Sequence, residues 1–284
     1  MGWLEQQVSF SIPSHSDLMP RTPLRVFSSA DAIGEELAQR LLERIEHARI
    51  TETRLVLGCP TGRTPRPTYR AMARRLAETK QDISHLTLVM MDEYLVASER
   101  GFEYAPEHNV WSCHHFVREE IAGPLNEGLP PANRIRDESI WFPDPRDPDT
   151  FDHRVADAGG INFFILASGA SDGHVAFNAP GSARDSRTRI IRLSEETRRD
   201  NLQTFPVFGV LAEVPSHGIS VGIGTIASAK EAVMIVSGGG KRLTLTRMLS
   251  AACYEPDWPA TVIHECAIRE IWSDAEAARP MEAP

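Results

Sequence analysis

Short apolar runs alternate along the chain with longer stretches in which apolar residues recur at helical spacing. Residues 86–91 (Leu-Thr-Leu-Val-Met-Met) and 161–166 (Ile-Asn-Phe-Phe-Ile-Leu) are nearly continuous apolar runs, as is typical of central strands covered on both faces. After Ser28 and Ser29, which are suited to cap a helix, apolar residues spaced by four predict a helix. These positions are Ile33, Leu37, Leu41 and Ile45.

The same alternation continues through most of the sequence. Strands are expected at residues 24–27 and 54–58, and a strand, a helix and a strand between residues 218 and 240. Alternating strands and helices predict a three-layer α/β/α sandwich with a mostly parallel, Rossmann-like sheet.

The position of the loop-forming residues along the chain predicts one domain. Residues 124–150 are rich in Pro, Asn and Asp and predict a long surface connection, but strands resume after it. We therefore expect a single domain over residues 24–270. An extended arm over residues 1–23 should precede it, and a polar, alanine-rich tail over residues 271–284 should follow.

Composition and charge exclude several classes of protein. The 284 residues carry a formal charge of −9 with a pI near 5.6, so there is no basic footprint for nucleic acid. The four cysteines are scattered without a Cys-x-x-Cys pair, which argues against a zinc knuckle or a disulfide framework and fits a reducing cytoplasm. No signal peptide and no membrane span are predicted.

Polar residues follow two of the apolar runs, at the strand edge where α/β sheets bind ligands. Asp172 and His174 lie two apart after residues 161–166, and a carboxylate that accepts the imidazole N–H can fix its tautomer for acid–base work. A turn-capping Asp beside a structural His is the alternative interpretation. Asp92 follows residues 86–91 and is either a desolvated base or a helix-capping or surface acid.

The loop after residues 54–58 is a candidate anion site. It contains Thr61, Gly62, Arg63 and Thr64 before a helix bearing Tyr69, Met72 and Leu76. Small residues that open a helix expose backbone N–H groups and the positive end of the helix dipole. A capped strand-to-helix turn is the alternative. No Gly-Lys-Ser/Thr follows, so nucleotide hydrolysis is not predicted.

Histidines are frequent after Asp92, at His108, His114 and His115, where a helix is expected to run to about Ile121. Adjacent His114 and His115 would point in different directions on a helix, and no acidic ligand pattern lies near them. We therefore predict no metal site.

Residues 172–180, Asp-Gly-His-Val-Ala-Phe-Asn-Ala-Pro, resemble the Asp-Gly-His-Ile-Ala-Phe-Asn-Glu-Pro signature of the glucosamine-6-phosphate deaminase (isomerase) family. Three further motifs resemble that family in the same order: the Pro-Thr-Gly-x-Thr-Pro loop at 60–65, Asp-Glu-Tyr at 92–94 and Ser-Arg-Thr-Arg at 186–189. Residues 260–266 are similar to the last strand of the family. The likeness covers roughly residues 24–270.

The resemblance implies a sugar-phosphate isomerase or deaminase that needs no metal or organic cofactor. Asp92 would move a proton between C1 and C2 of the opened sugar, and His174, oriented by Asp172, would assist ring opening. The phosphate of the sugar would be held by Thr61, Gly62, Arg63, Thr64 and Lys241. A phosphorylated sugar is thus the expected ligand. The protein is expected to be cytoplasmic and to form a homo-oligomer.

Two positions depart from the family pattern. Ala179 stands where the family has a glutamate, and Gln203 where it has a later active-site arginine. Because a carboxylate near a substrate ammonium group is lost at Ala179, weak or absent activity on glucosamine 6-phosphate is expected, with another sugar phosphate or a lactone as the substrate.

Two other functions are alternatives. The related 6-phosphogluconolactonases share the Asp-Gly-His, but their motif continues Thr-Ala-Ser-Leu-Phe-Pro, unlike residues 175–180. A noncatalytic sugar-phosphate sensor would not need Asp92, Asp172 and His174 together.

Overall fold

The computed structural model describes residues 21–99 and 101–281. Most of the arm predicted over residues 1–23 therefore lies outside the described residues. The strands are β1 Leu24–Phe27, β2 Leu55–Cys59, β3 Leu86–Met90, β4 Asp92–Ser98, β5 Gly101–Tyr104, β6 Ile140–Trp141, β7 Phe163–Ala167, β8 Arg189–Arg192, β9 His217–Ser220, β10 Glu231–Val236 and β11 Ile268–Asp274. The α-helices are α1 Ala30–Ile50, α2 Arg66–Thr79, α3 Cys113–Phe116, α4 Gly123–Asn126, α5 Pro148–Asp157, α6 Glu195–Thr204, α7 Ile223–Ala227 and α8 Arg242–Ser250.

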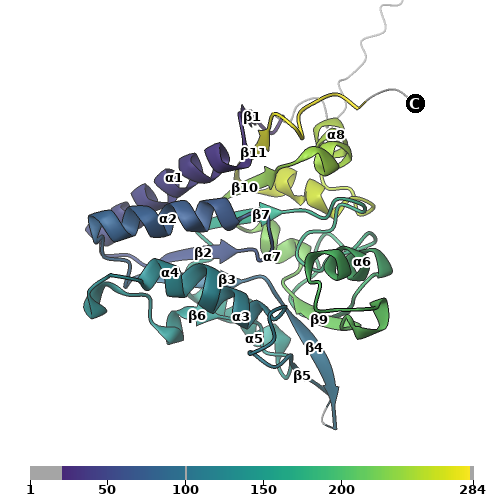
Figure 1. Ribbon diagram of the computed structural model, residues 1–284, viewed down its shortest axis with the longest axis horizontal. Helices are drawn as coiled ribbons and strands as arrows, with labels where there is room; N and C mark the ends of the chain where they lie inside the picture. Colours follow the sequence, from purple (N-terminus) through teal and green to yellow (C-terminus); the bar gives the residue numbers. More distant parts are fainter. Residues whose placement is uncertain (1–20, 100, 282–284) are drawn as a thin grey trace, which may run out of the picture.

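Seven strands form the central sheet, in the order β1-β11-β10-β7-β2-β3-β6 (Figure 1). All neighbouring pairs in this sheet are parallel, so the carboxyl ends of its strands meet at one edge. β2, β3 and β10 are buried at every position, as the continuous apolar runs predict.

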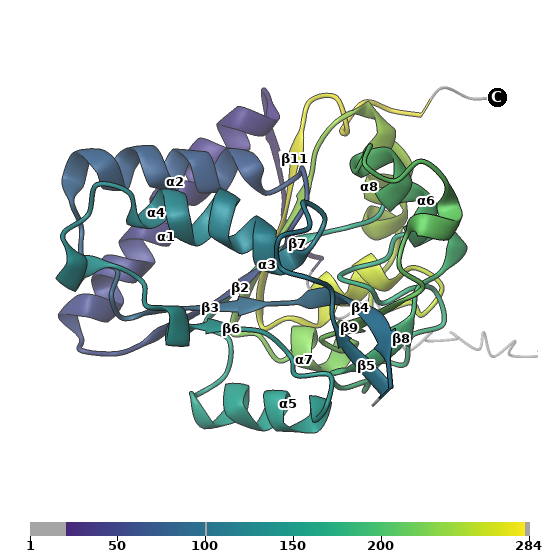
Figure 2. The same cartoon turned by 60° about the horizontal axis from the view of Figure 1, so that its bottom comes forward.

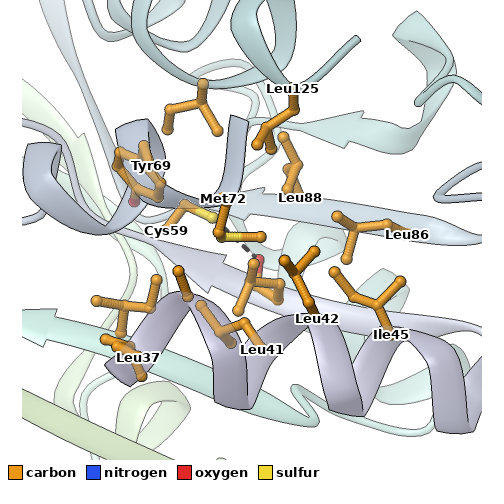
Figure 3. Close-up of a cluster of buried hydrophobic side chains, with 14 of the residues drawn as sticks. Leu37, Leu41, Leu42, Ile45, Cys59, Tyr69, Met72, Leu86, Leu88 and Leu125 are labelled. Carbon is orange, nitrogen blue, oxygen red and sulfur yellow. Dashed lines mark hydrogen bonds between the residues drawn. The ribbon is translucent and has the colours of Figure 1, made fainter. Parts of the chain in front are cut away.

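One face of the sheet packs against α1, α2 and the helix around α4. Side chains alternate between the two faces along each strand, so that Leu55 and Leu57 of β2 join this core and Val56 joins the opposite one. The helix predicted from residues spaced by four is α1, and all four of those residues are buried. The residues that meet in this layer include Leu37 and Leu41 of α1, Tyr69 and Met72 of α2, Leu88 of β3 and Leu125 of α4 (Figure 3).

The opposite face is covered by α5, α7 and α8 together with a 3₁₀ segment that spans Pro259–Glu265. Phe151 of α5, Ile226 of α7 and Met248 of α8 are buried there in the same core as the strand residue Phe164. Each face of the sheet therefore has its own core, and the predicted three-layer α/β/α architecture is confirmed.

A second sheet of four antiparallel strands, in the order β5-β4-β9-β8, adjoins the central sheet (Figure 2). It was not predicted from the sequence. β4 begins at Asp92, directly after β3 and Met91, and Asp92 pairs with Ser220 of β9. The chain therefore passes from one sheet to the other at Asp92.

Three expectations from the sequence are wrong. The strand expected at residues 260–266 is the 3₁₀ segment Pro259–Glu265, and the last strand is β11, which runs past residue 270 to Asp274. The connection expected over residues 124–150 contains β6, an edge strand of the central sheet. The helix expected to end near Ile121 continues through a π-helical segment, Val117–Ala122, into α4.

No helix within residues 21–99 and 101–281 has the length and apolar character needed to cross a membrane.

Candidate active site

A cavity of about 570 Å³ lies at the carboxyl ends of β2, β3, β7 and β10. β10, β7, β2 and β3 are consecutive neighbours in the sheet, so the loops that follow them converge. Asp172 does not line the cavity but lies behind His174, to which it is hydrogen-bonded. The predicted residues that line the cavity are Thr61, Gly62, Arg63, Thr64, Asp92, His174 and Lys241.

Asp172 and His174 form a hydrogen-bonded pair in the loop after β7. Oδ1 of Asp172 lies 2.7 Å from Nδ1 of His174 and also accepts the backbone N–H of His174 at 3.1 Å. Burial favours a raised pKa for Asp172, but its hydrogen bonds with His174 and the charge of that ring outweigh burial and hold the pKa below its ordinary value. Asp172 can therefore accept the Nδ1 proton, which leaves Nε2 of His174 for a ligand.

Two glycines make room for this pair. A Cβ atom on Gly169 would lie 2.2 Å from Nδ1 of His174 and 2.7 Å from Oδ1 of Asp172. Gly173 has a φ of +67°, and a Cβ there would lie 2.4 Å from the ring of Trp258. Both positions therefore require glycine.

Asp92 lies where the chain crosses from β3 to β4 and is only 6% exposed. Burial raises its pKa to about 7, with a smaller contribution from the neighbouring Glu93 carboxylate; the thiol of Cys113 and the charge of His174 oppose the rise. A carboxyl group with this pKa exchanges a proton readily near neutral pH.

Glu93, the next residue, is fully buried and has a different role. Its carboxylate accepts hydrogen bonds from Ser112 Oγ at 2.9 Å, from the backbone N–H of Cys113 at 3.0 Å and from the backbone N–H of His114 at 2.8 Å. His114 Nδ1 lies 2.6 Å from the same carboxylate, and its ring stacks on Phe142. Glu93 thus fastens the start of α3 to β4.

Asn178 and Ser220 connect the loop after β7 to the second sheet. The amide nitrogen of Asn178 donates to the backbone oxygen of Val221 at 2.8 Å. Ser220 Oγ accepts the backbone N–H of Phe177 at 3.2 Å. Because Ser220 is the strand partner of Asp92, these bonds fix the loop that carries His174 relative to Asp92. Neither Asn178 nor Ser220 was predicted as a site residue.

Part of the cavity lining is suited to an anion. The loop at residues 61–64 precedes α2, and the turn Gly239–Lys241 precedes α8, so two helix N-termini present their positive ends there. Lys241 Nζ donates to the backbone oxygen of Ser168. Burial lowers the pKa of Lys241.

Helix α6 and the residue after it contribute to the lining of the cavity, although the sequence pointed to this segment only through Gln203. Gln203, which the resemblance aligns with an arginine of the family, lines the cavity. Ala179 does not line the cavity, and its backbone oxygen accepts from Ser182 N at 3.1 Å and Oγ at 2.7 Å. The lining residues of this segment are Asp200, Asn201, Gln203, Thr204 and Phe205.

The histidines after Asp92 do not form a cluster of metal ligands. In the described residues, no group of three or more His, Cys, Asp or Glu side chains is arranged to hold a metal ion.

No protein-family model matches the chain. A glucosamine-6-phosphate deaminase of Shouchella clausii is 31% identical over 254 residues, which are 86% of this chain and 93% of that protein. One of Rhodococcus opacus is 35% identical over 211 residues, 73% of this chain and 74% of that protein. Among solved structures, a monomeric glucosamine-6-phosphate deaminase matches with a TM-score of 0.76 at 24% identity, covering 90% of this chain and 98% of that one. The 6-phosphogluconolactonase of Trypanosoma cruzi matches with a TM-score of 0.67 at 16% identity, covering 92% and 97%.

Proposed function

Since the chain belongs to the glucosamine-6-phosphate deaminase family, we propose that it is a sugar-phosphate aldose–ketose isomerase or deaminase. The observation that carries this proposal is a buried carboxyl group with a pKa of about 7, Asp92, in the same cavity as a His174 whose Nδ1 is held by Asp172. An acid–base group and an oriented imidazole are what ring opening followed by proton transfer requires.

Ring opening is the step proposed for His174. With its Nδ1 proton accepted by Asp172, Nε2 can take the proton of the C1 hydroxyl and deliver it to the ring oxygen as the bond between C1 and that oxygen breaks and the C1 carbonyl forms. The open-chain aldehyde then lies within the cavity.

Proton transfer between the two carbons is the step proposed for Asp92. Its carboxylate takes the proton from C2 and returns it to C1. The C2 hydroxyl gives up its proton and O1 gains one, so that the carbonyl group moves from C1 to C2. Burial supports this role because a desolvated carboxylate is a stronger base than one in water.

The phosphate group is proposed to bind at the two helix N-termini. Its donors there would be the backbone N–H groups of residues 61–64 and the hydroxyls of Thr61 and Thr64. The cationic side chains of Arg63 and Lys241 would also contact it. Their shared position in the lining of one cavity supports this assignment.

A screen of sugar phosphates tests the proposed function. Ketose formation, ammonia release and lactone hydrolysis would be measured side by side with the same enzyme. Turnover of a phosphorylated aldose to a ketose, with or without ammonia, is expected. Hydrolysis of a phosphorylated lactone as the sole activity would contradict the proposal.

Lys241→Ala should weaken the binding of phosphorylated ligands selectively. A charge-assisted hydrogen bond contributes about 1.5 to 3 kcal/mol, so the Kd for a hexitol 6-phosphate should rise by at least about tenfold. Calorimetry with the hexitol and its 6-phosphate measures this, and Lys230→Ala, which removes an exposed lysine, is the matched control. Equal losses for both ligands would count against the assignment.

Ala179→Glu should increase ammonia release from glucosamine 6-phosphate relative to wild type. Ala179 itself does not line the cavity. The proposed reason is that the longer glutamate side chain would reach into it and restore a carboxylate near the substrate ammonium group. The test is to measure the rate of ammonia release from glucosamine 6-phosphate by the wild type and by Ala179→Glu. Wild-type turnover at about 1 to 10³ per second, not improved by the glutamate, would show that Ala179 does not change the substrate.

A reducing cytoplasm is the proposed compartment, which the four free cysteines support. Assembly into a homo-oligomer stays a prediction.

A further inference from the structure

The thiol of Cys113 lies beside the carboxyl group proposed as the base. Cys113 begins α3, is 2% exposed, and its Sγ lies 3.4 Å from Oδ1 of Asp92. No step of the proposed reaction uses this side chain, and the sequence alone shows it only as one of four scattered cysteines.

Toward Asp92 the thiol acts as a hydrogen-bond donor. Burial, followed by the charges of Glu93 and Asp92, raises the pKa of Cys113 well above its ordinary value, so it keeps its proton and is not a nucleophile. Its backbone N–H is fixed by Glu93 at 3.0 Å, which holds the side chain next to Asp92. Thr61 Oγ1 lies 3.8 Å from Sγ.

Resting on the proposed function, we infer that Cys113 is a positioning residue that donates its S–H to Oδ1 of Asp92 and so leaves Oδ2 to exchange the proton with the substrate. In the described part of the chain, no hydrogen bond to Oδ2 of Asp92 is found. The bond to Oδ1 fixes the orientation of the Asp92 carboxyl group. Without this bond, the substrate itself would have to fix that orientation.

The same bond favours the ionised form of Asp92. The titratable and charged groups that face Asp92 are Glu93 and Tyr94 from β4, Cys113 from α3 and His174 from the loop after β7. Because the base must be ionised to act, kcat/KM should rise with pH through about 7 in the wild type. Loss of the thiol should move that midpoint upward.

The test compares Cys113→Ala and Cys113→Ser with the wild type. Cys266→Ala is the control, because it removes an equally buried cysteine whose thiol donates to the backbone oxygen of Ile226 instead. The titration of Asp92 is followed by carboxyl-carbon NMR in the free protein, with the signal assigned by its loss in Asp92→Asn. The pKa should be higher by about half a unit in Cys113→Ala and lower in Cys113→Ser, since a hydroxyl is a stronger donor.

Equal pKa values of Asp92 in the wild type and in whichever Cys113 variant folds would overturn the inference. The kcat/KM profiles should shift in the same order, with activity at pH 6 lower by about threefold in Cys113→Ala. If no variant turned over a sugar phosphate while the NMR order held, the proposed function would fail and the role of Cys113 in holding Asp92 would stand.

Discussion

Asp92→Asn should lower the rate of isomerisation by about 10² to 10⁴ while the affinity for substrate stays nearly unchanged. The amide has the size of the carboxyl group and can still accept a hydrogen bond from Cys113, but it cannot take a proton from C2. Both kcat and the exchange of the C2 proton with solvent should fall together. Binding of a hexitol 6-phosphate, measured by calorimetry, should not.

Asp149→Asn is the matched control, because Asp149 is exposed in the first turn of α5 and does not line the cavity. It should keep wild-type activity. Unchanged isomerisation and exchange in Asp92→Asn would remove Asp92 from the mechanism.

His174→Gln should lower kcat/KM on a ring-closed sugar phosphate by about 10² to 10⁴. Glutamine can hydrogen-bond to Asp172 but has no nitrogen that takes up a proton near neutral pH. A hexitol 6-phosphate has no ring to open, so its Kd, measured by calorimetry, should be that of the wild type if the variant is folded.

The control for this substitution is His108→Gln, since His108 is exposed and outside the cavity lining. Activity of His174→Gln within about twofold of the control would show that the imidazole is a structural group, the alternative left open by the sequence.

The parts of the site that could be predicted are local or follow from the parallel sheet. Asp172 and His174 are two residues apart, so one loop brings them together. Asp92 and the loop at residues 61–64 follow neighbouring parallel strands, whose carboxyl ends necessarily meet.

The parts that could not be predicted depend on contacts between distant segments. The second sheet pairs β4 with β9, whose residues lie far apart in the sequence, and no apolar pattern indicated this pairing. Cys113 meets Asp92 only because Glu93 holds the start of α3. The last strand was placed at residues 260–266 from the resemblance alone. The actual strand, β11, has no continuous apolar run, because it carries Arg269 and Glu270. The charge of Glu270 is compensated by an ion pair with Arg40 of α1 that the local sequence does not show.

The most direct test of the proposed proton transfer is the conversion of a phosphorylated aldose by the wild-type enzyme in deuterium oxide. If Asp92 carries the proton between C2 and C1 and exchanges it with solvent, NMR should show a ketose phosphate with deuterium at C1. A product formed without any ketose, such as the acid from a phosphorylated lactone, together with no exchange at C2 of any aldose phosphate, would contradict the account.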